Sequence, residues 1–309
     1  MAGLRVALVQ MDTRLGDLQA NLEQHLETLQ QAGKQDADLV IFPELSLTGY
    51  LLQDLTPTVA LRPLPSEPVF AALLKASREV DLLFGFVEVD GRHRFYNSAA
   101  YLSQGELTHL HRKVYLPTYG LFDEGRFFAW GDQVRAFDTR FGRFGALICE
   151  DFWHAAPPYL LWLDGADVLL FISASPGRGL NREPALESTR WVERINQAYA
   201  SLFTAFVCST GRVGYEDGLN FWGGATAHDP DGELICKGPY HEPALVLAEL
   251  DLDQLRRSRA RLPVLRDERT ALVQRELTRI LNAGRALRER PWIAPRSPST
   301  STPSWPARS

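Results

Sequence analysis

Long apolar runs and cysteines are both scarce in this 309-residue sequence. No stretch approaches about 18 consecutive apolar residues, so no membrane-spanning helix is expected. The first residues, Met1 to Met11, lack the basic region and long apolar stretch of a secretory signal. The three cysteines are irregularly spaced and form no C-x-x-C pair, which argues against a disulfide framework and a cysteine metal site. We therefore expect a cytoplasmic protein that makes no membrane contact.

Positive charge is scarce as well. The chain carries 33 basic and 38 acidic residues, for a formal net charge of -5. A broad basic face for nucleic acid is therefore not expected. The sequence also has no P-loop, no G-x-G-x-x-G after a strand and no H-E-x-x-H pair, so we expect neither a metal nor another cofactor.

Short apolar runs alternate with helical patterns along most of the chain. The expected strands are Val6–Val9, Leu39–Phe42, Leu82–Val89, Tyr96–Tyr101, Phe144–Cys149, Val168–Ser173, Phe203–Cys208 and Ala244–Leu250. Helices are expected after Asp17, which can cap the first of them, around Val69–Val80 and over Ala185–Ala200. Strands buried on both faces and alternating with helices predict an α/β sandwich.

The composition changes only near the C-terminus. We predict one catalytic domain over residues 1–267 and a helical extension over 268–290, with an apolar side formed by Val273, Leu277, Ile280 and Leu281. Residues 291–309 are rich in proline, serine and threonine, and this composition predicts disorder.

Cys149 is the first candidate for chemistry. It ends an apolar run and precedes Glu150 and Asp151, so its side chain can face a cleft at the carboxyl end of a strand. A lone cysteine in this position is also a common core residue. Cys208 and Cys236 lack the acidic residues that follow Cys149, and we interpret them as core residues.

Glu44 and Lys113 are the second and third candidates. Glu44 follows a buried run and the rigid Pro43, and a glutamate screened from water is suited to act as a general base near neutral pH. Lys113 is one of only four lysines among the 33 basic residues, which indicates that its position requires a compact ammonium rather than a guanidinium.

The histidines offer weaker alternatives. His109 and His111 alternate along an expected strand, but no carboxylate or cysteine stands at a matching spacing, so we interpret them as surface residues. His154 follows Cys149 closely enough for a Cys–His pair, which is the alternative mechanism.

Three segments together resemble the Glu–Lys–Cys motifs of the nitrilase superfamily of carbon–nitrogen hydrolases. They are Phe42–Tyr50, Arg112–Pro117 and Cys149–Trp153, in the family's order. The resemblance implies a four-layer α-β-β-α sandwich, usually assembled as a homo-oligomer. It also implies that Glu44 is the base, Lys113 the oxyanion stabiliser and Cys149 the nucleophile.

Two segments, Lys113–Phe128 and Arg256–Arg269, resemble more closely the glutaminase domain of glutamine-dependent NAD synthetases. In that family an ATP-dependent synthetase domain follows, but no Ser-Gly-Gly-x-Asp-Ser pyrophosphate loop occurs in this sequence. We therefore expect a stand-alone glutaminase-like module that cannot make NAD by itself.

The resemblance assigns further roles around these three residues. Glu124 resembles the second active-site glutamate of the family, and the backbone N–H of Glu150 is expected to assist Lys113 with the oxyanion. The Lys113 ammonium is also expected to lower the pKa of Cys149. Residues expected to bind the substrate are Tyr119, Trp153, Ser175 and, for a substrate carboxylate, Arg178 or Arg182.

The expected reaction is hydrolysis of a small linear amide such as glutamine or an ω-amide relative. An N-carbamoyl or nitrile hydrolase would use the same three residues. A third alternative is a partner subunit that is nearly inactive alone and passes ammonia to a separate synthetase; the Arg256–Arg269 segment motivates it.

Overall fold

The computed structural model describes residues 3–177 and 187–288. The chain divides into two compact units, Met1–Arg266 and Asp267–Ser309. The tail predicted over 291–309 lies outside the described residues, as do Arg178 and Arg182.

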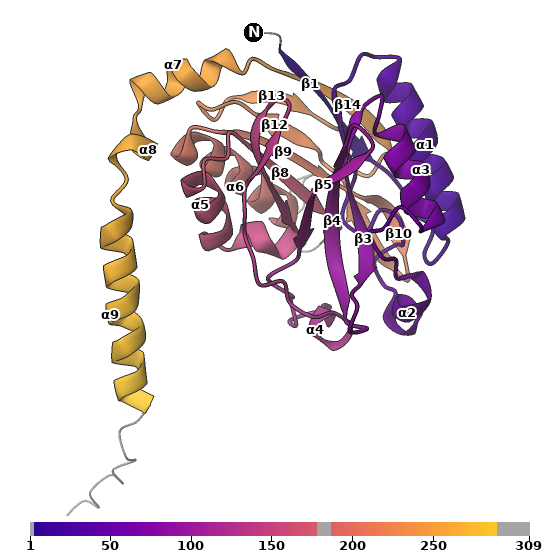
Figure 1. The fold of residues 1–309 in the computed structure, drawn as a ribbon, viewed down its shortest axis with the longest axis horizontal. Helices are drawn as coiled ribbons and strands as arrows, with labels where there is room; N and C mark the ends of the chain where they lie inside the picture. Colours follow the sequence, from indigo (N-terminus) through magenta and orange to yellow (C-terminus); the bar gives the residue numbers. More distant parts are fainter. Residues whose placement is uncertain (1–2, 178–186, 289–309) are drawn as a thin grey trace, which may run out of the picture. The chain divides into compact units, whose positions relative to one another are not determined.

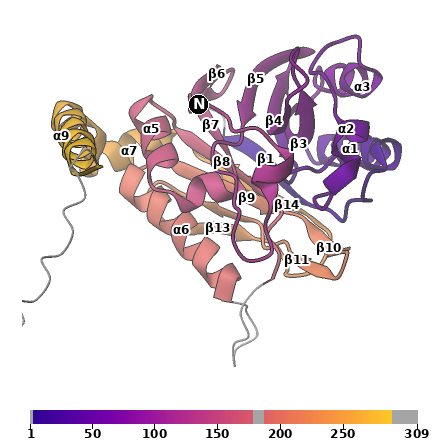
Figure 2. The same cartoon turned by 90° about the horizontal axis from the view of Figure 1, so that it is seen from below.

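Two six-stranded sheets form the centre of the first unit within the described residues (Figures 1 and 2). The first sheet has the strand order β14 (Ala244–Leu250), β1 (Leu4–Gln10), β2 (Leu39–Ile41), β3 (Asp81–Val89), β4 (Phe95–Ser103) and β5 (Glu106–Arg112). The second has the order β13 (Leu234–Lys237), β12 (Thr226–His228), β9 (Phe206–Gly211), β8 (Val168–Ser173), β7 (Gly142–Ile148) and β6 (Phe137–Thr139). A separate hairpin consists of β10 (Val213–Glu216) and β11 (Leu219–Trp222).

The described helices are α1 (Leu18–Gly33), η1 (Gln53–Leu55), α2 (Thr56–Val59), α3 (Pro68–Ala76), α4 (Glu124–Phe127), η2 (Cys149–Trp153), α5 (Ala156–Leu163), α6 (Glu187–Phe203), α7 (Asp253–Arg261), α8 (Val264–Asp267) and α9 (Thr270–Arg288). As predicted, Asp17 caps α1, because its Oδ1 atom accepts a hydrogen bond of 3.0 Å from the Ala20 N–H.

The two sheets pack against each other through a shared apolar core. Val6 and Ile41 of the first sheet belong to the same buried cluster as Ile148, Leu170 and Cys208 of the second. Residues of both sheets are therefore buried between them, as in a sandwich.

The outer faces of the sheets are covered by helices. Val40 of the first sheet clusters with Leu22 of α1 and Phe70 of α3, and Leu147 of the second sheet clusters with Leu161 of α5 and other residues of α5 and α6. Figure 1 shows α1 and α3 on one side of the sandwich and α5 and α6 on the other. The four-layer α-β-β-α architecture expected from the resemblance is confirmed.

Parallel strands at the centre of each sheet determine where the polar loops lie. β2 is parallel to both β1 and β3, and β8 is parallel to both β7 and β9. Glu44 follows β2, Cys149 directly follows β7, and Ala174 directly follows β8. The carboxyl ends of these strands are thus the source of the polar groups of the site.

The interpretation of His109 and His111 as surface residues was wrong. His111 is buried and its Nε2 atom lies 2.8 Å from Asp151 Oδ2, while His109 is partly buried and stacks on Phe137. Of the other cysteines, Cys208 is buried in the core as expected and Cys236 is half-buried.

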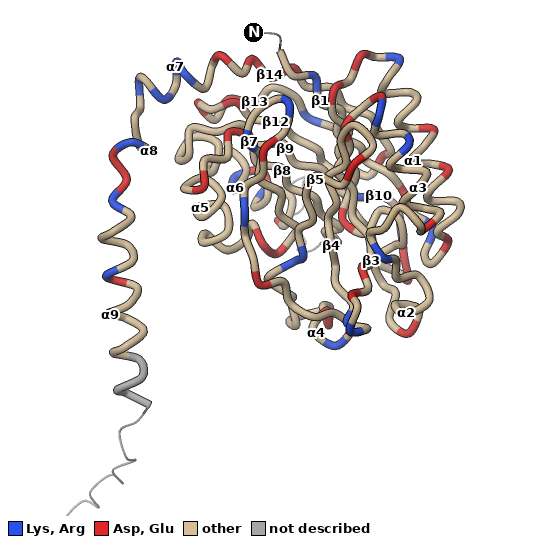
Figure 3. Tube along the Cα trace, in the orientation of Figure 1, with Lys and Arg blue, Asp and Glu red and all other residues tan. Residues whose placement is uncertain are grey.

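Acidic and basic residues are interspersed along the trace of the first unit in the view of Figure 3. Among the helices of the described ranges, none has the length and the apolar character needed to cross a membrane.

Candidate active site

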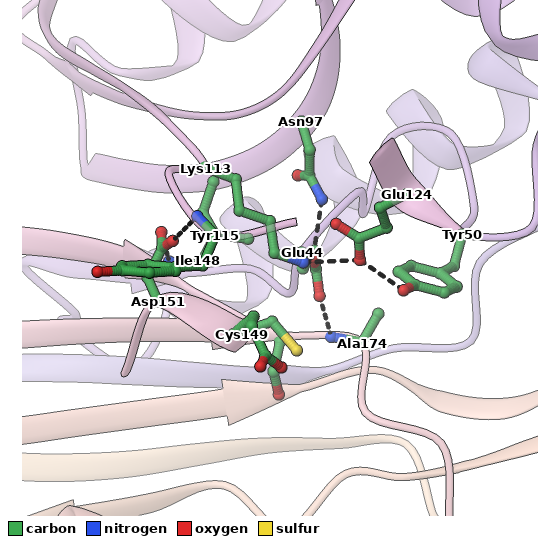
Figure 4. Close-up of polar contacts among 12 residues, drawn as sticks. Glu44, Tyr50, Asn97, Lys113, Tyr115, Glu124, Ile148, Cys149, Asp151 and Ala174 are labelled. Atoms are coloured by element: carbon green, nitrogen blue, oxygen red, sulfur yellow. Dashed lines mark hydrogen bonds and ion pairs between the residues drawn. The ribbon is translucent and has the colours of Figure 1, made fainter. Parts of the chain in front are cut away.

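Glu44 is fully buried and its carboxylate is held by three donors. Oε1 accepts hydrogen bonds from Asn97 Nδ2 at 2.7 Å and Lys113 Nζ at 2.8 Å, and Oε2 accepts one from the backbone N–H of Ala174 at 2.7 Å. Figure 4 shows the carboxylate surrounded by these three groups. The donors come from both sheets, so the orientation of the carboxylate depends on how the sheets pack.

The backbone of the Glu44 loop passes very close to strand β3. A Cβ atom on Gly85 would lie 2.3 Å from the backbone nitrogen of Leu45 and 2.8 Å from the Cα of Glu44. Only glycine allows this approach without a shift of the loop. Gly85 therefore contributes to the position of Glu44 by its lack of a side chain.

Lys113 follows β5 and is fully buried between two carboxylates. Its Nζ atom donates to Glu44 Oε1 at 2.8 Å and to Glu124 Oε1 at 2.7 Å. Burial alone would lower the pKa of Lys113, but the carboxylates of Glu124 and Glu44 raise it well above its usual range. Lys113 is therefore a permanent cation of the site.

Glu124 begins α4 and is also buried. Its Oε1 atom accepts a hydrogen bond of 2.5 Å from the Tyr50 hydroxyl in addition to the bond from Lys113. Burial raises the pKa of Glu124 to about 7, with Lys113 opposing and Glu44 adding to the rise. Glu124 therefore exchanges its proton near neutral pH.

Cys149 stands at the turn from β7 into η2. Its backbone φ angle of 45° lies in the left-handed region, which is strained for a residue with a side chain. The side chain is mostly buried, and the Sγ atom lies 3.7 Å from the Oγ of Ser175. A strained turn of this kind at the end of a strand is often part of a functional site.

The pKa of Cys149 is raised well above its usual value, although Lys113 opposes the rise, as expected. Burial is the largest cause and the negative charge of Glu44 the second, and together they outweigh the opposing effect of Lys113. The resting group is thus a thiol, which needs a base to become a nucleophile.

Asp151 joins the lysine segment to the cysteine turn. Its Oδ1 atom accepts hydrogen bonds from the backbone N–H groups of Val114 at 3.0 Å and Tyr115 at 2.9 Å. Its Oδ2 atom accepts one from the Ile148 N–H at 3.1 Å and lies 2.8 Å from His111 Nε2. This buried carboxylate fixes the distance between the backbones that carry Lys113 and Cys149.

The remaining sequence-predicted residues lie nearer the surface. Tyr119 is exposed and its hydroxyl donates to the Glu150 carboxylate at 3.0 Å. Trp153 is half-buried with its ring 5.9 Å from that of Trp191, the first exposed aromatic residue of α6. His154 stacks on Tyr115 and lies 3.7 Å from Glu150.

The structure brings together the residues that the sequence singled out for the chemical step. Glu44, Lys113 and Glu124 form one hydrogen-bonded cluster, and their charges all act on Cys149. The alternative Cys–His pair receives no support, because the contacts of His154 are with other side chains.

Sequence reasoning missed three groups that complete the cluster. These are the Asn97 amide and the Ala174 N–H, which bind Glu44, and the Tyr50 hydroxyl, which binds Glu124. Tyr50 lies within one of the quoted motifs, but nothing in the local sequence around Asn97 distinguishes it from an ordinary strand residue.

The site combines a thiol, a carboxylate base and a fixed ammonium. This set can perform nucleophilic attack on a carbonyl carbon with stabilisation of the resulting oxyanion. Within residues 3–177 and 187–288, no group of histidine, cysteine and acidic side chains is arranged to hold a metal ion.

Comparison with known proteins agrees with this chemistry. Residues 5–260 match the family model for carbon–nitrogen hydrolases. The chain is 32% identical over 261 residues to a glutamine-dependent NAD(+) synthetase of Acinetobacter baylyi, covering 83% of this chain and 46% of that protein.

Solved structures give the same result. A glutamine-dependent NAD+ synthetase from Acinetobacter baumannii, in complex with ADP, superposes with a TM-score of 0.73 at 31% identity, covering 82% of this chain and 46% of that one. A mutant amidase of the nitrilase superfamily from Nesterenkonia AN1 superposes with a TM-score of 0.71 at 25% identity, covering 84% of this chain and 96% of that one.

The chain spans about half the length of the NAD synthetases that it matches. The match to the family model covers most of the first compact unit and includes the positions of Glu44, Lys113 and Cys149. The resemblance seen in the three sequence motifs is confirmed, and the chain belongs to the carbon–nitrogen hydrolase family.

Proposed function

We propose that this hydrolase cleaves the C–N bond of a small linear amide through a thioester on Cys149. The observation that carries the proposal is the buried cluster in which Lys113 bridges Glu44 and Glu124 and whose charges act on Cys149. Burial of three ionisable groups is costly, and a site with strongly perturbed pKa values is typical of catalysis.

The first half of the reaction forms the thioester. Glu44 accepts the proton of the Cys149 thiol as the sulfur attacks the amide carbonyl carbon. The oxyanion is stabilised by the Lys113 ammonium and the backbone N–H of Glu150, and each such donor contributes roughly 10²–10³ in rate. The C–N bond then breaks, and Glu44 returns its proton to the departing nitrogen, which leaves as ammonia or an amine.

The second half releases the acid. Glu44 accepts a proton from a water molecule, whose oxygen attacks the thioester carbonyl, and the same donors stabilise the second oxyanion. The C–S bond breaks, the sulfur takes back the proton, and the carboxylic acid leaves. Glu124 keeps Lys113 in place throughout, since it is the second carboxylate on the ammonium.

For the substrate we propose glutamine or an ω-amide relative. The Glu150 carboxylate, held by Tyr119, supplies a negative charge next to Cys149 that suits a substrate ammonium group. Ser175 stands beside the sulfur, Trp153 forms an adjoining aromatic surface, and Arg178 or Arg182 is assigned to a substrate carboxylate. The names of the similar synthetases include the words glutamine-dependent, which favours this choice.

The test is mass spectrometry of the protein after rapid acid quenching with a panel of amides. We expect the peptide that contains Cys149 to gain the mass of the acyl group. The Glu44→Gln variant should form the adduct more slowly and, once it has formed, retain it longer than the wild type. A modified serine, or turnover with no adduct on Cys149 at any quench time, would contradict the mechanism.

The panel also separates the proposal from its enzymatic alternative. Ammonia release is compared for glutamine, an N-carbamoyl amino acid and a simple nitrile at equal concentrations. A higher kcat/KM for the carbamoyl compound or the nitrile would assign the same three residues to that other reaction.

We also propose a separate ammonia-dependent synthetase as a partner, because the proteins to which the chain is similar are glutamine-dependent NAD synthetases. Glutaminase activity that is unchanged by an added synthetase would argue against this partnership.

A homo-oligomer is proposed from the exposed apolar side chains of α5 and α6, namely Leu160, Trp191 and Leu202. A cytoplasmic location is proposed because all three cysteines are free.

A further inference from the structure

A buried ion pair lies beneath the loop that carries Tyr50. Arg212 directly precedes β10 and Glu216 ends it, and both are almost fully buried. Arg212 Nη1 donates to Glu216 Oε2 at 2.6 Å. The guanidinium also lies 4.3 Å above the Phe221 ring of the paired strand β11, so its plane is held from a second side.

The other oxygen of Glu216 binds the Tyr50 loop. Glu216 Oε1 accepts hydrogen bonds from the backbone N–H groups of Tyr50 at 2.9 Å and Leu51 at 2.6 Å. Gly49 makes this approach possible, because a Cβ atom there would lie 2.8 Å from Glu216 Oε2 and its φ angle of 82° is strained for other residues. The carboxylate therefore fixes the backbone on both sides of the Tyr50 Cα.

From this anchored backbone the Tyr50 side chain reaches the candidate active site. Its hydroxyl donates to Glu124 Oε1 at 2.5 Å, and that oxygen accepts a bond of 2.7 Å from Lys113. A continuous series of contacts thus runs from Arg212 through Glu216, Tyr50 and Glu124 to the ammonium. None of these contacts involves the reacting sulfur.

A gain in stability alone does not explain a buried ion pair of this kind. Two charges removed from water are often replaceable by apolar residues at no loss of stability, whereas removing one partner leaves an uncompensated buried charge. The geometry here provides something that apolar packing cannot, namely a two-pronged acceptor directed at two successive N–H groups.

We propose that Arg212 and Glu216 are positioning residues for the amide hydrolysis described above: they hold the backbone at Tyr50 so that its hydroxyl stays on Glu124 and Glu124 stays on Lys113. The inference rests on the proposed function for its kinetic consequence. Its structural consequence, an ordered loop at Tyr50, is measurable without turnover.

The kinetic test is a double-mutant cycle of Glu216→Gln and Tyr50→Phe. Glutamine keeps the shape but presents an NH₂ group or a weaker acceptor to Arg212, and phenylalanine removes only the hydroxyl. Each single change is expected to lower kcat about tenfold with little change in KM, the effect of one hydrogen bond to a charged group. If both act through Glu124, the double variant is no slower than the slower single variant.

The structural test is hydrogen exchange of the peptide that contains Tyr50 and Leu51. We expect these amides to exchange faster in Glu216→Gln and at the wild-type rate in Tyr50→Phe. Asp81→Asn is the matched control. Asp81, the first residue of β3, is a buried carboxylate with an ion pair to Arg140, and neither residue belongs to the series of contacts described above. Its effect on kcat should be small and should multiply with that of Tyr50→Phe.

Multiplicative losses of kcat in the main cycle, or unchanged exchange in Glu216→Gln, would overturn the inference. If Glu216→Gln does not fold, Arg212→Lys keeps the positive charge but loses the fork, and the same cycle and exchange measurement apply to it. A wild-type protein with no Cys149 adduct and no turnover would instead refute the proposed function, and the exchange result would still decide the positioning role.

Discussion

The carboxylate of Glu44, which follows a strand of one sheet, accepts a hydrogen bond of 2.7 Å from the backbone N–H of Ala174, which follows a strand of the other. The same carboxylate binds Lys113 and Asn97 of its own sheet. The proposed base is thus held between the two sheets. Its orientation therefore depends on how the sheets pack against each other.

Cys149→Ala should abolish amide hydrolysis and leave the fold intact. Loss of the nucleophile is expected to reduce kcat by at least about 10⁴-fold. The core should tolerate the change, because alanine keeps the Cβ atom and removes only the sulfur, which has Ser175 Oγ as a polar neighbour at 3.7 Å. Ammonia release and thermal unfolding are the measurements. Cys208→Ala, in the core strand β9, is the control and should retain activity; substantial turnover by Cys149→Ala would remove the nucleophile assignment.

Lys113→Arg should be nearly inactive although it keeps the charge. The ammonium fits between two carboxylate oxygens at 2.8 and 2.7 Å in a fully buried position, which leaves no space for a planar guanidinium. We expect kcat to fall at least about 100-fold, the effect of losing one oxyanion donor. Lys237→Arg is the control, since Lys237 pairs with Glu193 in a half-exposed position. Similar activity of both variants would place Lys113 outside the chemistry.

Glu124→Gln should make the stability of the protein less dependent on pH. The pKa of Glu124 rises from an ordinary 4.5 to about 7 in the folded state. Between these values the folded state binds more protons than the unfolded state, so the stability falls as the pH rises through this window. A neutral glutamine removes this dependence, so the unfolding free energy of the variant relative to the wild type should be about 2 kcal/mol higher at pH 8 than at pH 5.

Urea denaturation at the two pH values measures this difference. The same variant should lose activity, because glutamine gives Lys113 no second negative charge. An equal difference between variant and wild type at pH 5 and at pH 8 would show that Glu124 is ionised in the folded protein across the whole range.

Gly85→Ala should disturb the base through the backbone. The new Cβ would lie 2.3 Å from the Leu45 nitrogen, so the loop that carries Glu44 must move. We expect a loss of about 1–3 kcal/mol in stability, as for overpacking in a core, together with a fall in kcat. Gly91→Ala has no atom within 4 Å of its Cβ and is the control. Wild-type kcat in Gly85→Ala would show that the loop adapts without moving the carboxylate.

Two of the predicted strands have the observed bounds. Val168–Ser173 is a continuous apolar run that is buried along its whole length, whereas Ala244–Leu250 is an edge strand of mostly half-buried residues that is still rich in apolar side chains. Strand β5, Glu106–Arg112, was indicated only by the alternation of His109 and His111, since most of its side chains are exposed or half-buried and polar. A strand of this composition shows no apolar run, and its place in the sheet depends on its pairing with β4.

The chemical residues were predictable and their supports were not. Glu44, Lys113 and Cys149 stand in recognisable motifs, whereas Asn97 and the Ala174 N–H become visible only when the two sheets are packed. A backbone donor has no sequence signature at all. The net rise of the Cys149 pKa was not predicted for a similar reason, because burial outweighs the lowering effect of Lys113 and cannot be read from the motif.

Asp151 spans the gap between the segment before Tyr115 and the turn at Cys149, and it does so with four contacts from one carboxylate. A movement of Cys149 relative to Lys113 on ligand binding would break these contacts and would therefore cost free energy. Specificity for substrates of different size would then be changed at side chains outside this framework, such as the exposed Tyr119, while the reacting groups stay fixed.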